Sequence, residues 1–320
     1  FIQTDETRSP VATVMGRAAN SNDTQRRTEV RLSNIQFLHN GNRTLADEEI
    51  DCFLLIPEPD ADDGDDDDNE VNRTGTAIWD CSFSGSSGTG FNSLKRGKNW
   101  IHQSSATNNG NNGFFTQGPD SLFHKCYAAN NGKEQIVCKS SATPMFYDLE
   151  CGPGLFPGQY PAILLQDNAT VTLLGGNING WVEFSGVEDN VASGNYGVYY
   201  RNVLSHVTFI LKEKSFVDDD DVVNVLTSFI KVTDQRGLHI NNCNFLPDTV
   251  TEDDPDNPGQ KRTRYLYRPE YIVNASGART RVLFECKLPP LDNLQWPAGA
   301  PTTWDGTIPT NSYDTICNHP

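Results

Sequence analysis

The chain has little of what marks several large classes of protein. Its 320 residues contain only short apolar runs, far below the roughly 20 residues that a transmembrane helix needs, so we expect no membrane span. Basic residues are outnumbered, with 25 Lys and Arg against 42 Asp and Glu and a formal net charge of −17. Such a surface repels a phosphate backbone, so nucleic acid is not an expected partner.

Helical patterning is also missing. No long segment repeats apolar residues at i, i+3, i+4 and i+7. The chain instead contains many short alternating runs of β-branched and aromatic residues, bounded by Asn and Gly, which is the pattern of short strands. Its 16 Phe, 10 Tyr and 5 Trp argue against a disordered acidic chain. We therefore predict an all-β protein.

The cysteines lack the spacing of a zinc site, because the chain has no Cys-x-x-Cys pair and no Cys/His cluster. Their even number suits a disulfide framework and an oxidising compartment, although reduced thiols that fill a core are the alternative. The disulfide candidates are all eight: Cys52, Cys81, Cys126, Cys138, Cys151, Cys243, Cys286 and Cys317.

Five Asn-x-Ser/Thr sequons lie mostly in predicted turns, where glycans are attached. The sequon asparagines are Asn22, Asn42, Asn72, Asn168 and Asn274. The first residue is Phe1, as expected for a mature chain whose signal peptide has been removed, or for a trimmed one. Together with the cysteines, the sequons predict a secreted, extracellular protein with covalent N-glycans.

One eight-residue pattern recurs along the chain, with apolar residues at positions 3 and 8 and Cys or Ile at position 6. Its best copies are residues 30–37, 76–83, 121–128, 238–245 and 281–288. First positions placed at Val30, Phe53, Thr76, Asn99, Ser121, Phe146 and Val171 follow one another at steps of 22 to 25 residues. Further units are placed near Val207, Leu238 and Arg281. A fixed period of this length in short strands predicts a solenoid, and the frame of a leucine-rich repeat is absent.

The pattern also predicts a bend in each unit. Two residues separate the inward positions 3 and 6, which breaks strict alternation and calls for a left-handed residue, a conformation that Asn and Gly tolerate best. The residues at this bend are Asn34, Gly175, Gly176, Asn241 and Asn242. Equivalent residues of stacked units form columns, in which each residue lies about 4.8 Å from the next.

Position 6 of the pattern holds half of the cysteines. Cys81, Cys126, Cys243 and Cys286 share this inward column, as disulfides or as unpaired core thiols. The other four lie off the column, and we expect them to link loops or the tail.

The runs LHINNCNF, TAIWDCSF, VRLSNIQF-LHNG and SLFHKCYAANNG resemble the V-x-I-x-N-C-x-F rung of the pectin-lyase-like superfamily. This resemblance implies a single-stranded right-handed parallel β-helix of about ten coils over residues 28–288. Residues 1–27 would then form an N-terminal arm or cap, and the Pro- and Trp-rich residues 289–320 a C-terminal cap or arm. The resemblance implies no single function, because the superfamily includes lyases, hydrolases, esterases, tailspikes, adhesins and structural proteins.

The catalytic motifs of these enzymes are incomplete here. The polygalacturonase set (NTD, DD, GHG and RIK), the pectate lyase elements and the methylesterase blocks are not found in full, so we name no catalytic residue. Two carboxylates on one face of successive coils would suffice for a glycosidase, and Asp148, Glu150, Asp167 and Glu183 are equal candidates. The six histidines, His39, His102, His124, His206, His239 and His319, fall in different units and suggest no cluster.

The acidic residues are concentrated in loops. Residues 58–70 hold nine carboxylates in thirteen positions. A Ca²⁺ site at Asp62, Asp63, Asp65 and Asp66 is one interpretation, and a solvated, self-repelling loop is the other. No other cofactor is predicted.

We therefore predict a non-catalytic secreted structural glycoprotein, a subunit of an extracellular filament, wall or appendage whose partners are itself or other extracellular proteins. The alternative is a carbohydrate-active enzyme or polysaccharide-binding protein of the same fold. Its ligand would lie along aromatic side chains such as Trp100, Trp181, Tyr199 and Tyr200.

Overall fold

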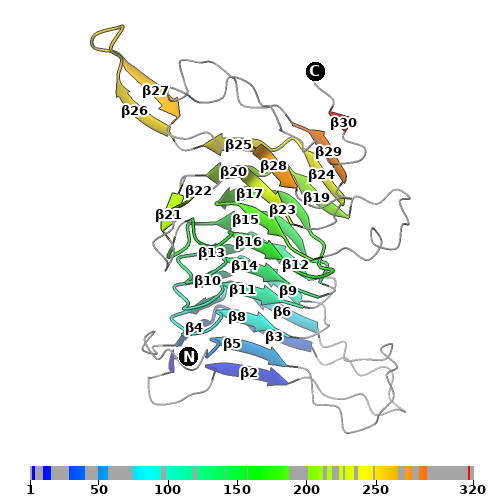
Figure 1. The fold of residues 1–320 in the computed structure, drawn as a ribbon. Helices are drawn as coiled ribbons and strands as arrows, with labels where there is room; N and C mark the ends of the chain where they lie inside the picture. The colour runs from blue at the N-terminus through cyan, green and yellow to red at the C-terminus, as the bar shows by residue number, and fades with distance from the viewer. Residues whose placement is uncertain are drawn as a thin grey trace.

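The computed structural model describes residues 2–3, 10–15, 29–39, 50–56, 75–94, 99–117, 121–140, 142–156, 158–186, 201–211, 215–217, 223–225, 228–233, 237–247, 249–265, 271–275, 281–286 and 316–317. All regular structure in these ranges is β-strand. Most strands pair in parallel within two large sheets, stacked from β2 at one end of the molecule to β29 at the other (Figure 1). The predicted all-β class is confirmed.

The nine-stranded sheet is wholly parallel. Its strands, in order, are β2 (Ala12–Met15), β5 (Phe53–Ile56), β8 (Phe91–Ser93), β11 (Phe114–Thr116), β14 (Ile136–Cys138), β16 (Ile163–Leu165), β18 (Val182–Phe184), β23 (Ser228–Val232) and β28 (Tyr271–Ala275).

The seventeen-stranded sheet consists of two rows of strands that meet at a bend. The first row contains β3 (Glu29–Ser33), β6 (Gly75–Trp79), β9 (Asn99–His102), β12 (Leu122–His124), β15 (Met145–Cys151), β17 (Thr172–Asn179), β19 (Asn202–Ser205), β24 (Gly237–Asn241), β29 (Arg281–Glu285) and β30 (Ile316–Cys317). The second row contains β1 (Ile2–Gln3), β4 (Gln36–His39), β7 (Ser82–Ser84), β10 (Ser105–Thr107), β13 (Tyr127–Ala129), β20 (Thr208–Leu211) and β25 (Asn244–Pro247). The long strands β15 and β17 run through both rows.

The chain visits the three rows in turn, and each strand pairs with the equivalent strand of the next turn of chain. After β6, β7 and β8, the chain returns as β9 beside β6, then as β10 beside β7 and β11 beside β8. Each turn therefore stacks directly on the previous one. This places residues that lie about one repeat apart in sequence side by side in space.

The bend between the first two rows is a column of left-handed residues. Their φ values lie between 47° and 77°, and they are Asn34, Asp80, Gln103, Lys125, Asp148, Gly175, His206 and Asn242. The predictions for Asn34, Asn242, Gly175 and Gly176 are confirmed, whereas Asn241 lies within β24 and is not left-handed. Lys125 and Gln103 show that the packing of neighbouring turns imposes this conformation even where the residue type does not favour it.

Phenylalanine columns fill the interior. Phe37 stacks on Phe83 with 5.3 Å between ring centroids, and Phe53 stacks on Phe91 at 5.5 Å. Phe123 and Phe146 continue the pattern at 4.7 Å. Stacked turns repeat the same inward position, so the rings form offset pairs that add stability beyond the area they bury.

Four predicted repeat units have the wrong register. Phe53 belongs to β5 of the nine-stranded sheet, so the turn that begins at Val30 extends to Thr76. The unit placed at Phe146 begins two residues earlier, because Met145 pairs with Leu122. Asn202, not Val207, continues the column of Leu238, and Val282, not Arg281, pairs with Leu238. At Phe53, Phe146 and Val207 a buried apolar residue at another inward position imitated the start of the pattern, whereas at Arg281 the alignment of Cys286 with Cys243 displaced the unit by one residue.

Two antiparallel hairpins interrupt the parallel sheets. They are β21 (Ser215–Val217) with β22 (Val223–Val225), and β26 (Thr249–Asp253) with β27 (Lys261–Tyr265). The second projects from the stack (Figure 1). At the ends of the chain, β1 pairs with β4, β2 pairs with β5, and β30 pairs with β29.

Candidate functional site

The outward side chains of the first row form a continuous surface, which we call the outer face. One of its columns runs from Trp79 through His102 and His124 to Tyr147, each directly opposite the next in register. The ring centroids of His102 and His124 lie 4.7 Å apart, and those of His124 and Tyr147 lie 6.3 Å apart. Four ring-bearing side chains from four successive turns are thus brought side by side.

The second column of the outer face is apolar over the same turns. Trp100, Leu122 and Met145 follow one another in register, and Trp100 is 56% exposed while Met145 is 40% exposed. Trp79, in the first column, is 36% exposed. Large apolar side chains of this exposure, contiguous over several strands, are typical of a surface that contacts another molecule.

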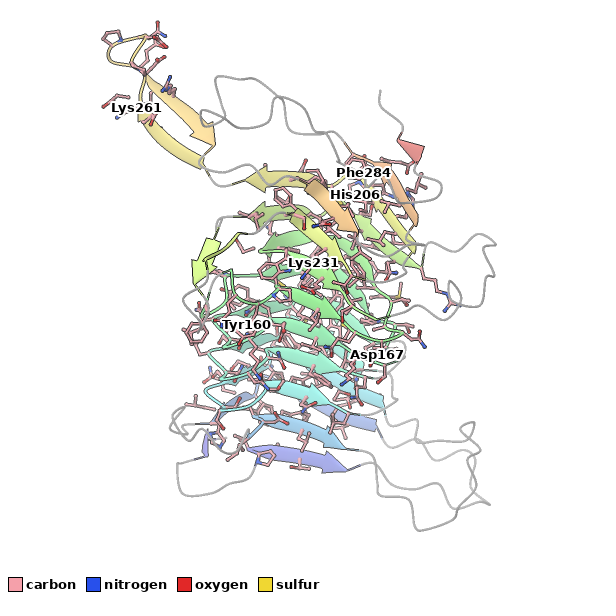
Figure 2. All side chains as sticks on the ribbon, in the orientation of Figure 1. Tyr160, Asp167, His206, Lys231, Lys261 and Phe284 are labelled. Atoms are coloured by element: carbon pink, nitrogen blue, oxygen red, sulfur yellow. The ribbon has the colours of Figure 1, made fainter. Side chains whose placement is uncertain are left out.

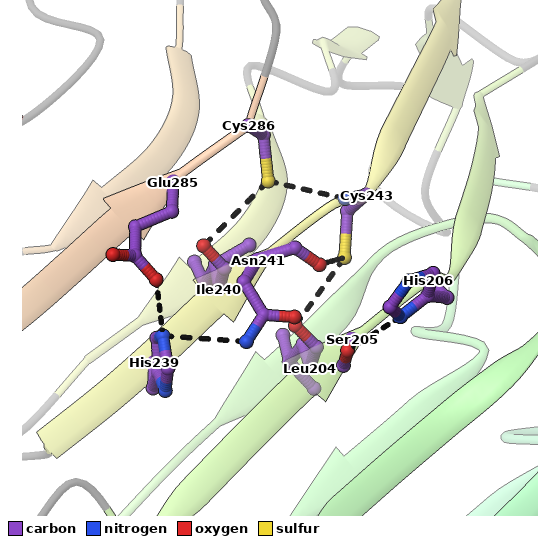
Figure 3. Close-up of polar contacts among 9 residues, drawn as sticks. All are labelled: Leu204, Ser205, His206, His239, Ile240, Asn241, Cys243, Glu285 and Cys286. Atoms are coloured by element: carbon purple, nitrogen blue, oxygen red, sulfur yellow. Dashed lines mark hydrogen bonds and ion pairs between the residues drawn. The ribbon is translucent and has the colours of Figure 1, made fainter. Parts of the chain in front are cut away.

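Further along the stack the outer face becomes polar. The first column continues through Leu174, Ser205 and Asn241 to Glu285, and the second reaches His239. The His239 Nε2 atom lies 2.7 Å from the Glu285 carboxylate and 3.3 Å from the Asn241 amide nitrogen (Figure 3). The carboxylate orients the imidazole at this end of the face.

A serine and a histidine also meet here, because the hydroxyl of Ser205 lies 2.7 Å from Nδ1 of His206. His206 is the left-handed residue of its turn, so its side chain leaves the strand at the bend. Figure 3 shows Ser205 with His206 and Glu285 with His239 as two separate pairs. Among the described contacts, no Ser–His–acid relay is therefore assembled.

A carboxylate cluster lies on the nine-stranded sheet. The Glu183 carboxylate accepts a hydrogen bond from the Trp181 indole at 3.2 Å and forms an ion pair with Lys231 at 3.2 Å. Figure 2 shows Lys231 over this sheet. Glu134, which precedes β14, accepts a hydrogen bond from the Asn112 amide at 2.7 Å. Burial raises the pKa of Glu134, and the charge of Glu183 adds to this shift. The two carboxyl groups thus have different environments.

The four predicted glycosidase carboxylates are not brought together. Asp148 is an exposed bend residue, and Glu150 accepts two hydrogen bonds from the Asn177 amide on the second row. Asp167 is a left-handed turn residue. Glu183 lies close enough to Glu134 for their charges to interact, and the sequence did not indicate Glu134 because it precedes its strand.

Seven of the eight predicted disulfide cysteines are buried free thiols: Cys52, Cys81, Cys126, Cys138, Cys151, Cys243 and Cys286. The structure therefore differs from the predicted disulfide framework. Cys81 and Cys126 are separated in their column by Ser104, whose hydroxyl accepts a hydrogen bond from the Cys81 N–H at 3.1 Å. Cys138 and Cys151 lie in core strands, not in loops.

The environments of these thiols differ. Burial raises the pKa of Cys52 and of Cys126 to about 12 in each case, which keeps both protonated. Cys243 and Cys286 are neighbours, and the Cys243 N–H donates to the Cys286 sulfur at 3.2 Å (Figure 3). The hydrogen bond between the two thiols lowers the pKa of Cys286 and raises that of Cys243.

The remaining predicted sites fall mostly outside the described residues. These are Asn22, Asn42, Asn72, Asp62, Asp63, Asp65, Asp66, Tyr199 and Tyr200, and no side-chain description is given of Cys317. Asn168 lies in a turn and Asn274 lies in β28, and both are partly exposed. Trp100 is exposed on the outer face, whereas Trp181 is 7% exposed.

No family model, no curated protein and no solved structure matches this chain. Within the described ranges, no helix is long and apolar enough to cross a membrane. In the same ranges, no three His, Cys, Asp or Glu side chains gather closely enough to hold a metal ion.

Proposed function

We propose that this protein is a non-catalytic, secreted structural glycoprotein that assembles with itself or with other extracellular proteins into a filament, wall or appendage. In this proposal the stacked sheets form a right-handed parallel β-helix of the pectin-lyase-like type, with about ten coils. The predicted terminal segments 1–27 and 289–320 cap it or reach a neighbour.

The outer face is the observation that supports assembly. Trp79, Trp100 and Met145 expose large apolar surfaces on neighbouring turns, where a monomeric protein in water gains nothing from them. Aromatic residues and Met are enriched where proteins contact one another. Covering this face with a second chain would remove it from water.

The sheet edges offer a second kind of contact. In the described part of the chain, β2 and β28 are the terminal strands of the nine-stranded sheet. An open edge pairs readily with a strand of another chain, so end-to-end stacking would extend the sheet into a filament.

Electron microscopy and sedimentation velocity over a range of concentrations test this proposal. We expect concentration-dependent assemblies of the wild-type protein and a loss of assembly in the double variant Trp100→Ser, Met145→Ser. Leu246→Ser is the matched control, because Leu246 is 46% exposed on the second row, away from the outer face. Single rods of the wild-type protein at every concentration would contradict the proposal.

The second candidate is a polysaccharide-binding protein, favoured by the column of four rings. Flat aromatic side chains offer their faces to sugar rings, and polar groups at the same face add hydrogen bonds. Affinity electrophoresis in gels that contain polysaccharides would detect retardation that Trp79→Ser abolishes. Retardation of a protein that stays monomeric would favour this function over assembly.

A further inference from the structure

Two neighbouring imidazoles of the outer face have the geometry of a pair of metal ligands. His102 and His124 face each other across the β9–β12 pairing, with ring centroids 4.7 Å apart and ring planes inclined at 63°. Two imidazoles that share one metal through bonds of about 2.0–2.1 Å have centroids roughly 4.5–6 Å apart. The observed separation lies in this range before any movement of either ring.

A second observation is independent of this distance. The Nδ1 atom of His102 is shielded from solvent and has no hydrogen-bond partner. A buried polar nitrogen without a hydrogen-bond partner destabilises the folded protein relative to one that has a partner. The residues opposite His102 in register are Trp79 and His124, so the two neighbouring strands offer it no hydroxyl, amide or carboxylate in register.

We propose that His102 and His124 bind one divalent transition-metal ion of the class that prefers imidazole nitrogen, such as Zn²⁺, Ni²⁺ or Cu²⁺. Each ring supplies one nitrogen, and rotation about the last side-chain torsion brings the two nitrogens toward a common point. Water completes the coordination, because no third His, Cys, Asp or Glu of the described residues joins the pair. Imidazole ligands favour these ions over Ca²⁺ and Mg²⁺.

The surroundings shape the site. Trp79 and Tyr147 flank the two histidines along the column, one on each side of the pair. The bend residues beside these strands add the charged groups Asp80, Lys125 and Asp148, which are all exposed. Two carboxylates against one ammonium group leave the local balance slightly favourable to a cation.

Isothermal titration calorimetry with Zn²⁺ tests the site in the full-length protein, in a buffer with excess Mg²⁺ that competes for carboxylates. We expect one equivalent of Zn²⁺ to bind at neutral pH. Either His102→Gln or His124→Gln should weaken this binding by at least about tenfold, since even the partners behind a metal ligand are worth that much. His206→Asn is the matched control, because it removes a histidine at the bend, outside the pair, and suits the left-handed backbone.

The histidine NMR signals give a second readout that does not depend on variants. Zn²⁺ should shift the imidazole resonances of His102 and His124 and leave those of His206 in place. Circular dichroism confirms that each variant keeps its strand content, so a loss of binding is not a loss of fold. Zn²⁺ binding that is unchanged in both Gln variants, or no binding by the wild-type protein, would overturn the proposal. It does not rest on the proposed structural role.

Discussion

Neighbouring phenylalanines in β11 provide a sharp test of which side of the strand faces the core. Phe114 is 0% exposed and lies between Phe91 and Phe123, with ring-centroid distances of 6.2 Å and 5.6 Å. Phe115 is the next residue, points to the other side of the sheet and is partly exposed. Replacing each in turn by Ala removes the same atoms from two opposite faces.

The expected losses of unfolding free energy differ several-fold. Removing a fully buried ring costs roughly 3–5 kcal/mol, because apolar contact is lost and a cavity remains. Phe114 also makes two aromatic contacts, each worth about 0.5–1.5 kcal/mol, so we expect about 4 kcal/mol for Phe114→Ala. Phe115→Ala leaves no internal cavity and should cost about 1 kcal/mol.

Urea unfolding monitored by circular dichroism measures the difference. With a slope of about 3 kcal/mol per molar urea, the midpoint should fall by roughly 1.3 M for Phe114→Ala and by roughly 0.3 M for Phe115→Ala. The slopes of the two variants must agree with that of the wild type for this comparison to hold. Equal losses, or a larger loss for Phe115→Ala, would refute the register, since a slip of one residue exchanges the two faces.

Three further outcomes are expected. Gly176→Ala should lower the free energy of unfolding, measured in urea, by at least about 2 kcal/mol more than Gly259→Ala. Both glycines have positive φ, but a Cβ at Gly176 would lie 2.0 Å from the Leu149 carbonyl oxygen, whereas a Cβ at Gly259 would meet nothing within 4 Å. Iodoacetamide should label Cys286 of the native protein before the other described cysteines, because its lowered pKa gives more thiolate at a given pH. Peptide mass spectrometry measures this labelling, and Cys243→Ser should slow it. Burial raises the pKa of Glu134 above its ordinary value of 4.5, so the folded state binds the proton more tightly than the unfolded state does. The thermal midpoint should therefore rise as the pH falls from the raised folded-state pKa toward 4.5, and Glu134→Gln should remove this rise.

The all-β class and the stacking of turns could be predicted because both depend on local, repeated signals. Ile78, Ile101 and Phe123 recur at the same inward position, and each is buried as the pattern required. The bend was predictable where the residue type reveals it, as at Asn34 and Asn242. It was not predictable at Lys125, because only the hydrogen bonds of the neighbouring turns force that residue into the left-handed region.

The state of the cysteines could not be derived from their number. An even count suits disulfides, but whether two thiols meet depends on which turns are adjacent. Ser104 is position 6 of the unit that begins at Asn99, and the register of three strands confirms that it lies between Cys81 and Cys126. The same limit applies to the carboxylates, since Glu134 approaches Glu183 across turns that the sequence separates by many residues.

The sequence analysis missed the contact between His102 and His124. His102 and His124 belong to the units that begin at Asn99 and Ser121, so both occupy position 4 of the pattern. The prediction treated different units as different places, whereas stacking makes the same position of adjacent units the closest of neighbours. Inward positions must stay apolar to fill the core, which makes them regular and readable. Outward positions need not be apolar, so the side chains that distinguish this protein from other stacked sheets lie there. Predicting their contacts from sequence requires the outward columns to be aligned as strictly as the inward ones.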